Sequence, residues 1–248
     1  MSYKAEPPAK TIDQIGTRPK RFWRATAVAE ADGGFAVHLD GRPVKTPQGQ
    51  GLVLPNRELA EKVEAEWAAV VDQVQYEAMP LTRLGFAAID RMDAVLDATV
   101  AEVLRYAETD LVCYPSEYPA ALIAREAAAW LPLIDWAEAE LGLVFHQNKT
   151  LMFQPQPLET SMGIQSLIEG ASVYERAGLM AAMPLFGSVI LALAVWRGRL
   201  TGEEAFAASR IGEEFQTETW GRDEEAAQRS ENMKVQARSL DVWFAGLR

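Results

Sequence analysis

Hydrophobic and polar positions alternate in the first third of the chain, which is the period of a β-strand with one buried face. In the clearest example, Phe35, Val37 and Leu39 fall on one side of the strand and His38 on the other. The pattern predicts strands over 22–28, 35–39, 42–46 and 52–54, with turns at Asp32-Gly33-Gly34 and Asp40-Gly41. We expect an antiparallel meander of about four strands.

The hydrophobic period becomes helical after residue 55. Asn56 is a suitable helix N-cap, and it is followed by apolar residues at helical spacing, Leu59, Val63, Trp67, Val70 and Val74. Residues 79–86 have the character of a joint. Later apolar stripes predict helices over 96–107, 123–141, 160–169, 172–182, 185–197, 201–221 and 233–247, with 143–147 either a short strand or an extended link.

The most apolar stretch of the chain, residues 185–196, has no charged residue and is apolar on every face. It ends a run of twenty uncharged residues, 177–196, which is long enough to raise the question of a membrane span. Pro184 and the Gly187-Ser188 pair interrupt that run, and many of its residues are small. The pattern therefore favours a helix at the centre of a soluble core over a membrane-spanning one.

These elements predict an α+β protein with a small antiparallel β-rich part before a larger helical part. We expect a flexible tail over 1–20, a β-meander plus helix domain over 21–80, and a helical domain over 81–248. A length of 248 residues is sufficient for two modest domains.

Composition narrows the classes of function. A net charge of −11 argues against binding to nucleic acid, which requires clustered Lys and Arg side chains. The single cysteine, Cys113, leaves no internal disulfide and no thiol-based metal cluster, and its apolar surroundings suggest a packed side chain. The first residues contain no secretory apolar segment, so we expect a soluble protein in a reducing cytoplasm.

The sequence lacks the common catalytic and nucleotide-binding motifs. The sequence has no Walker-type phosphate loop, no G-x-G-x-x-G after a strand, no H-E-x-x-H and no C-x-x-C. Its two histidines, His38 and His146, are far apart along the chain. We therefore expect no cofactor, no metal and no enzymatic activity. The alternative is a metal-dependent enzyme that uses the carboxylates clustered in 213–225, although acids spread over a helix more often form a solvated face.

One arrangement on the predicted helix 201–221 is less ordinary. At 100° per residue, Phe206, Glu213 and Trp220 form a line spaced by seven residues, roughly opposite a core-facing stripe that contains Phe215. This line either packs against the last helix or forms a docking surface, because aromatic side chains beside a charge are typical of binding hot spots. Trp67 has a similar ambiguity, and its place in an apolar stripe favours the core.

Several segments, taken in order, resemble one known family. They are Lys20-Arg-Phe-Trp-Arg24, Gly33-Gly-Phe35, Leu39-Asp-Gly-Arg-Pro-Val-Lys-Thr-Pro47, Ala65-Glu-Trp67, Met79-Pro-Leu-Thr-Arg83, Thr109-Asp-Leu-Val-Cys-Tyr114, Trp130-x-Pro-Leu-Ile-Asp-Trp136 and Glu213-Glu-Phe-Gln-Thr-Glu-Thr-Trp-Gly221. The set is similar to the assembly chaperones of F1-ATP synthase that bind the α subunit. It extends from about residue 20 nearly to the last helix.

The resemblance implies a chaperone that covers the unassembled α subunit of F1 and leaves as the α/β ring forms. It also implies that partner binding involves Trp67 and an acid of the pair Glu213-Glu214, to which the aromatic line adds Phe206 and Trp220. The family often has a third acid before this pair, where this chain has Gly212. We expect a monomeric bacterial member acting in the cytoplasm, with eukaryotic relatives in the mitochondrial matrix.

Overall fold

A computed structural model describes residues 19–148, 153–221 and 224–248 of the chain. Four strands come first, β1 (Thr26–Ala31), β2 (Gly34–Leu39), β3 (Arg42–Pro43) and β4 (Val53–Leu54). Helical elements follow: α1 (Arg57–Ala68), η2 (Tyr76–Ala78), α2 (Pro80–Arg91), α3 (Leu96–Glu108), η3 (Leu111–Cys113), α4 (Ala120–Leu141), α5 (Leu158–Gly170), α6 (Val173–Phe186), α7 (Val189–Trp196), α8 (Gly202–Ser209), α9 (Ile211–Trp220) and α10 (Glu224–Ala245). The predicted α+β class is confirmed.

The four strands form one antiparallel sheet in which β2 pairs with β1, β3 and β4. The turn at Asp40-Gly41 has positive φ at both residues, 48° and 79°, as the two-residue hairpin requires. The carboxylate of Asp40 also accepts hydrogen bonds from the backbone N–H groups of Arg24 and Ala25. The prediction was wrong about the first strand, which begins at Thr26 and continues to Ala31.

Helix α1 covers the sheet through the predicted apolar stripe. Asn56 caps it as expected, because its side-chain oxygen accepts a hydrogen bond from the Leu59 N–H at 2.9 Å. Leu59 and Val63 are fully buried, and the stripe continues past the end of the helix to Val70 and Val74, which are also buried. The expected tail lies mostly outside the described residues, but Lys20 forms a β-bridge with Gln73.

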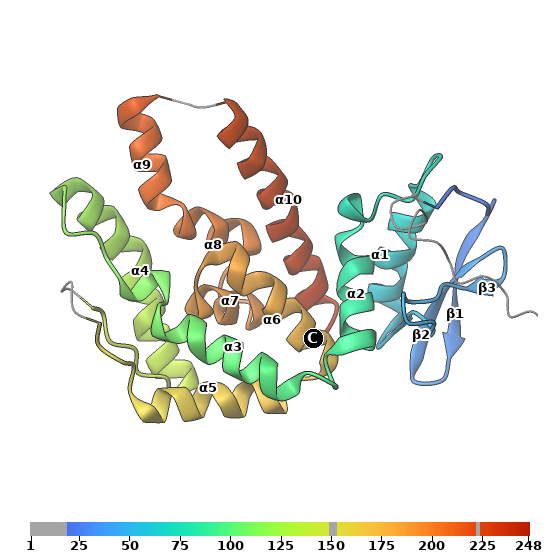
Figure 1. Cartoon of the computed structure of the whole chain (residues 1–248), viewed down its shortest axis with the longest axis horizontal. Helices are drawn as coiled ribbons and strands as arrows, with labels where there is room; N and C mark the ends of the chain where they lie inside the picture. Colours follow the sequence, from blue (N-terminus) through green and yellow to red (C-terminus); the bar gives the residue numbers. More distant parts are fainter. Residues whose placement is uncertain (1–18, 149–152, 222–223) are drawn as a thin grey trace, which may run out of the picture.

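Most of the expected joint at residues 79–86 is helical, because α2 begins at Pro80. Proline suits the first turn of a helix, where its missing N–H would have no intrahelical partner. Helix α2 then packs against α1 on one side and α6 on the other. It therefore bridges the sheet end of the molecule and the helical body, as Figure 1 shows.

Helix α7 is the centre of the helical body. All eight of its residues are buried, and it packs against α3, α4, α6, α8 and α10. The predicted core helix is confirmed, but residues 185–196 do not form a single helix. Gly187 adopts the left-handed conformation that ends α6, and the Ser188 side chain caps α7. None of the helices in the described ranges is both long and apolar enough to cross a membrane.

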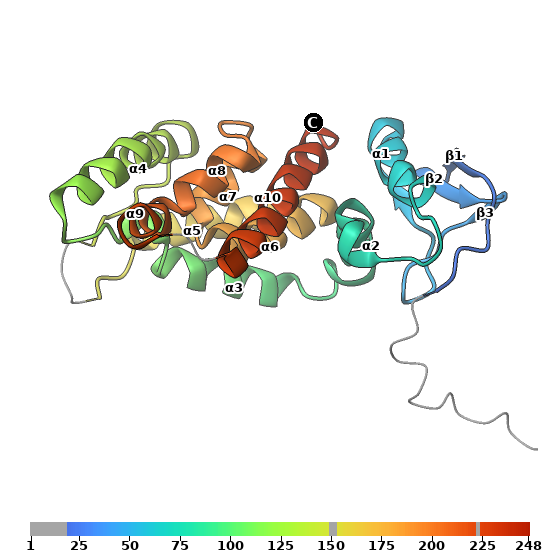
Figure 2. The ribbon, with the colours of Figure 1, turned by 90° about the horizontal axis from the view of Figure 1, so that it is seen from above.

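The molecule is elongated, with the sheet and α1 at one end and α4 and α9 at the other (Figures 1 and 2). The stripes predicted for α3 and α4 are buried or half-buried, as expected, and the apolar edge of α10 is buried around Ala237, Leu240 and Phe244. One hydrophobic cluster extends from Trp23 beside the sheet to Phe244 of α10. The chain ends beside α1, where the Asn56 side-chain amide donates to the Gly246 carbonyl.

Candidate functional site

The predicted helix over 201–221 is two helices. The capping box at Thr201 and Glu204 is present, but the helical hydrogen bonding breaks at Arg210, whose φ and ψ are −111° and 9°. Gly212, a weak helix former, lies two residues after this break, in the first turn of α9. The expected line of Phe206, Glu213 and Trp220 is therefore wrong as geometry, because its members lie on two differently oriented helices.

Phe206 lies in the core and not on a surface. It is 2% exposed, and the Arg210 guanidinium lies 5.2 Å from the centre of its ring. Arg210 also donates a hydrogen bond to the Leu185 carbonyl at 3.2 Å and pairs with Glu213 at 2.6 Å. The break thus turns the α8 aromatic inward and leaves Glu213 outside, at the start of α9.

Helix α9 stands at the far edge of the body, where it packs on α4 and α8 (Figure 1). Phe215 is half-buried, and the Arg125 guanidinium of α4 lies 5.2 Å from the centre of its ring. Arg125 also forms an ion pair with Glu218 at 2.8 Å. The sequence reading missed Arg125, because a contact between residues far apart in the chain leaves no periodic signal.

The outer side of α9 carries three of the predicted partner-binding residues. Glu213 and Glu214 are exposed, and Trp220 at the end of the helix is 85% exposed. A ring this exposed takes no part in helix packing. Three predicted residues therefore share one surface helix, whereas Phe206 does not belong to that surface.

Most of the neighbouring carboxylates already have structural partners. Glu203 pairs with Arg238 at 2.9 Å, Glu204 caps α8, and Glu225 lies 3.8 Å from Arg229. Asp223 lies outside the described residues. Over the described ranges, no group of three or more His, Cys, Asp and Glu side chains is arranged to hold a metal ion.

Trp67 belongs to α1, which lies at the opposite end of the molecule from α9 (Figure 1), and it is 5% exposed, which agrees with the predicted core position. Its ring packs edge-on against Trp23 and Tyr76, with centroid distances of 5.5 Å and 6.5 Å. Tyr76 in turn contacts Phe86 of α2 at 5.9 Å. Trp67 thus packs against Tyr76, which contacts α2 through Phe86, and almost none of the Trp67 side chain is exposed.

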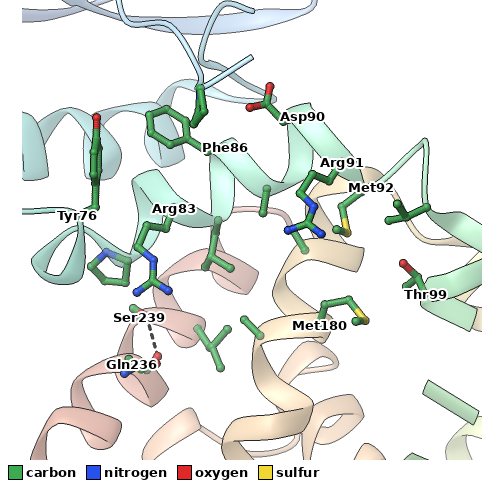
Figure 3. A pocket seen from close by; sticks show the side chains of 18 of the residues that line it. Tyr76, Arg83, Phe86, Asp90, Arg91, Met92, Thr99, Met180, Gln236 and Ser239 are labelled. Carbon is green, nitrogen blue, oxygen red and sulfur yellow. Dashed lines mark hydrogen bonds between the residues drawn. The ribbon is translucent and has the colours of Figure 1, made fainter. Parts of the chain in front are cut away.

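A groove that the sequence did not predict lies between α2, α6 and α10, with a volume of about 810 Å³. Leu84, Met180 and Leu240 belong to its apolar lining, and Tyr76 and Phe86 stand at one end. Arg83 and Arg91 project from α2 toward α10 and α6 respectively, as Figure 3 shows. No sequence motif marks this groove, because its lining comes from segments far apart in the chain, which include α3 and the loop at Gln48 besides α2, α6 and α10.

The stretch from Thr109 to Tyr114 has a structural explanation in Asp110. One carboxylate oxygen accepts hydrogen bonds from the Val189 and Ile190 N–H groups at 2.7 Å and 3.0 Å, at the N-terminus of α7. The other accepts from Val112 at 3.0 Å. Burial raises the pKa of Asp110 to about 6, and these hydrogen bonds oppose part of that rise. Asp110 therefore fixes the central helix, while the neighbouring thiol of Cys113 is buried, as predicted, with a raised pKa.

Comparisons with known proteins agree on one family. The sequence pattern of the ATP12 chaperone protein matches residues 20–138. The crystal structure of Atp12 from Paracoccus denitrificans is 37% identical with a TM-score of 0.86, covering 92% of this chain and 98% of that one. The crystal structure of the Atu1473 protein from Agrobacterium tumefaciens is 36% identical with a TM-score of 0.87, and the match covers 93% of this chain and 87% of that one.

Two yeast proteins are more distant relatives. The mitochondrial protein atp12 of Schizosaccharomyces pombe is 26% identical over 221 residues, which are 84% of this chain and 75% of that protein. The mitochondrial protein ATP12 of Saccharomyces cerevisiae is 26% identical over 149 residues, which are 51% of this chain and 46% of that protein. The likeness to the S. pombe protein and to the two bacterial structures extends over most of the chain, including its helical body.

Proposed function

The chain belongs to the ATP12 chaperone family, the assembly chaperones of ATP synthase, and we propose that its client is the unassembled α subunit of F1. This proposal rests on the resemblance of the ordered segments to the α-binding chaperones. In this role the protein covers an exposed surface of the subunit and makes or breaks no covalent bond.

The observation that carries the proposal is the outer side of α9. Trp220 exposes 85% of its surface at the end of a helix whose start carries the exposed acids Glu213 and Glu214. Exposing a large aromatic ring to water is unfavourable, and such a ring contributes nothing to packing within the chain. It gains binding energy once a partner covers it, which is why tryptophan is enriched in binding hot spots.

Transient holding fits the physical problem of assembly. A lone α subunit exposes an apolar surface that must later meet the β subunit, and such surfaces aggregate when left uncovered. A chaperone with few anchors binds weakly enough for the true partner to displace it. We propose that release needs no ATP hydrolysis by this chain, that the free protein is a monomer, and that it acts in the bacterial cytoplasm.

The test of this function is co-expression with the F1 α and β subunits, each alone and both together. We expect the chain to keep α in the soluble fraction and to have no effect on β. Solubility of α that does not depend on the chain, or selective retention of β, would refute the proposed client. A parallel assay of ATP hydrolysis by the purified chain should stay at background.

A further inference from the structure

The groove between α2, α6 and α10 joins the two parts of the molecule. Its walls combine Leu84 of α2, Met180 of α6 and Leu240 of α10, and the sheet-side residue Gln48 reaches its rim. A groove of about 810 Å³ has the size of an ordinary binding pocket. A ligand in it would contact both the loop at Gln48 on the sheet side and the helical body.

The groove carries positive side chains, although the chain as a whole is negatively charged. The protein carries a net charge of −11, yet Arg83 and Arg91 both line this groove and are exposed. Neither guanidinium is within ion-pair distance of an acid in the part of the chain that the structure describes. Among the described residues that line the groove, Asp90 is the one carboxylate, and it accepts hydrogen bonds from the Thr46 hydroxyl at 2.5 Å and the Gln48 N–H at 3.1 Å.

We propose that this groove receives a segment of the client that carries two carboxylates separated by apolar side chains. The proposal rests on the proposed function, since it adds a second client contact to the one proposed for the outer side of α9. Arg83 and Arg91 are eight residues apart on one helix, or about 12 Å along its axis. Acids about four residues apart in an extended segment, or about eight in a helical one, match that spacing.

The same geometry explains why the lining is mixed. The apolar floor formed by Leu84, Met180 and Leu240 offers burial to the client's side chains between the acids. Arginine suits the two charged positions, because its planar guanidinium can bind a carboxylate through two parallel hydrogen bonds. A second copy of this acidic chain is a poorer occupant, because its overall charge repels and it would leave its own groove open.

Photocrosslinking tests the contact directly in the complex of the full chain with α. A benzophenone side chain is placed at Ala181, an exposed residue of the groove wall, or at the exposed control position Glu30 on β1. We expect α to crosslink from Ala181 and not from Glu30, on a segment with two acids at the stated spacing. Equal crosslinking from both positions, or crosslinking from Ala181 to a second copy of the chain, would overturn the proposal.

Charge reversal supplies the second measurement. The variant Arg83→Glu/Arg91→Glu should bind α about tenfold more weakly or worse, because it places acids opposite acids. The control Arg42→Glu/Lys45→Glu makes the same change in net charge at exposed positions on the sheet side and should bind within about twofold of wild type. The pair Arg83→Gln/Arg91→Gln, which removes charge without reversing it, should give an intermediate loss and guards against misfolding.

The outcomes separate this inference from the proposed function. If the wild-type chain does not bind α at all, both are refuted. If the wild-type chain binds α and both groove variants bind equally well, the proposed client stands and the groove inference alone is refuted.

Discussion

The carboxylate of Glu66 in α1 accepts a hydrogen bond from the backbone N–H of Thr82 in α2 at 2.8 Å. Its other oxygen accepts from the Leu81 N–H, also at 2.8 Å. Since Met79 offers α2 no side-chain cap, Glu66 satisfies the first free N–H groups of that helix from outside. The contact joins two segments that resemble the family, Ala65 to Trp67 and Met79 to Arg83, and it fixes the helix that carries the groove arginines.

Replacing Glu66 should loosen the junction between α1 and α2. In Glu66→Gln an amide NH2 group faces one of the two N–H donors, and the charge that favours a helix N-terminus is lost. We expect a loss of about 1–2 kcal/mol in the free energy of unfolding, measured by urea denaturation. The control Glu61→Gln, on the same helix but exposed, should change it by less than about 0.5 kcal/mol. Equal effects at the two positions would contradict the capping role.

Trp67 should matter for stability before it matters for binding. Trp67→Ala removes a ring packed between Trp23 and Tyr76 in the core, so we expect a loss of about 3–5 kcal/mol. Trp67→Phe should cost less, because it keeps an aromatic ring and leaves no indole N–H without a partner. Thermal melting of both variants checks this order. A stable Trp67→Ala variant that fails only in client binding would show that the ring acts at a surface instead.

Asp110 predicts a pH dependence with a definite sign. Its folded pKa of about 6 exceeds that of an unfolded aspartate, about 3.9, so between these values the folded chain binds more protons. Its contribution to stability is therefore largest below about pH 4 and falls by about 3 kcal/mol as the pH rises to about 6. The difference in unfolding free energy between wild type and Asp110→Asn should follow this fall and become flat at higher pH. A difference that is constant with pH, or that grows, would contradict the raised pKa.

Sequence periodicity predicted much of the fold, because it records which face of an element is buried. The stripe of α1, the sheet turns, the capping box at Thr201 and the core position of residues 189–196 all follow from local patterns. Helix breaks were harder to predict. The turn at Arg210 falls inside a run whose periodicity continues across it. A boundary between two helices was predicted near residue 184, but α6 continues to Phe186 and α7 begins at Val189.

Contacts between distant segments were out of reach of the same reasoning. Three contacts depend on where helices meet in space: Glu66 with the N-terminus of α2, Asp110 with the N-terminus of α7, and Arg125 with the Phe215 ring. Phe206 is the clearest case for the candidate site: its spacing from Glu213 and Trp220 suggested a shared face, but the bend at Arg210 buries it. The resemblance to a chaperone family identified the class of function, which no local pattern in the chain could do.

The exposed end of α9 should affect binding and not folding. Trp220→Ala should leave the free energy of unfolding within about 0.5 kcal/mol of wild type, because the ring is 85% exposed. Its affinity for α should fall by about tenfold, as expected for a hot-spot tryptophan. Phe22→Ala, an exposed aromatic on the sheet side, is the matched control and should leave the affinity unchanged. A Trp220→Ala variant with unaltered affinity would remove this residue from the binding surface.

Glu213 tests the charged part of the same surface. Glu213→Lys exchanges a partly exposed ion pair, in which the Arg210 side chain is 22% and that of Glu213 66% exposed, for a repulsion, which should cost about 1 kcal/mol of stability. We expect weaker binding to α and a faster loss of the complex in a surface-plasmon-resonance measurement, whereas Glu140→Lys on α4 should behave like wild type. Unfolding of Glu213→Lys would indicate a structural role for this acid in place of a binding role.

We propose that this protein holds the F1 α subunit until the β subunit replaces it. Size-exclusion chromatography with light scattering, applied to the copurified complex before and after addition of β, tests this claim most directly. We predict one α subunit per chaperone chain, transfer of α into α/β assemblies on addition of β, and recovery of the free monomeric chain without ATP hydrolysis by it. A chain that elutes apart from α, or that stays bound to α when β is in excess, would contradict the account.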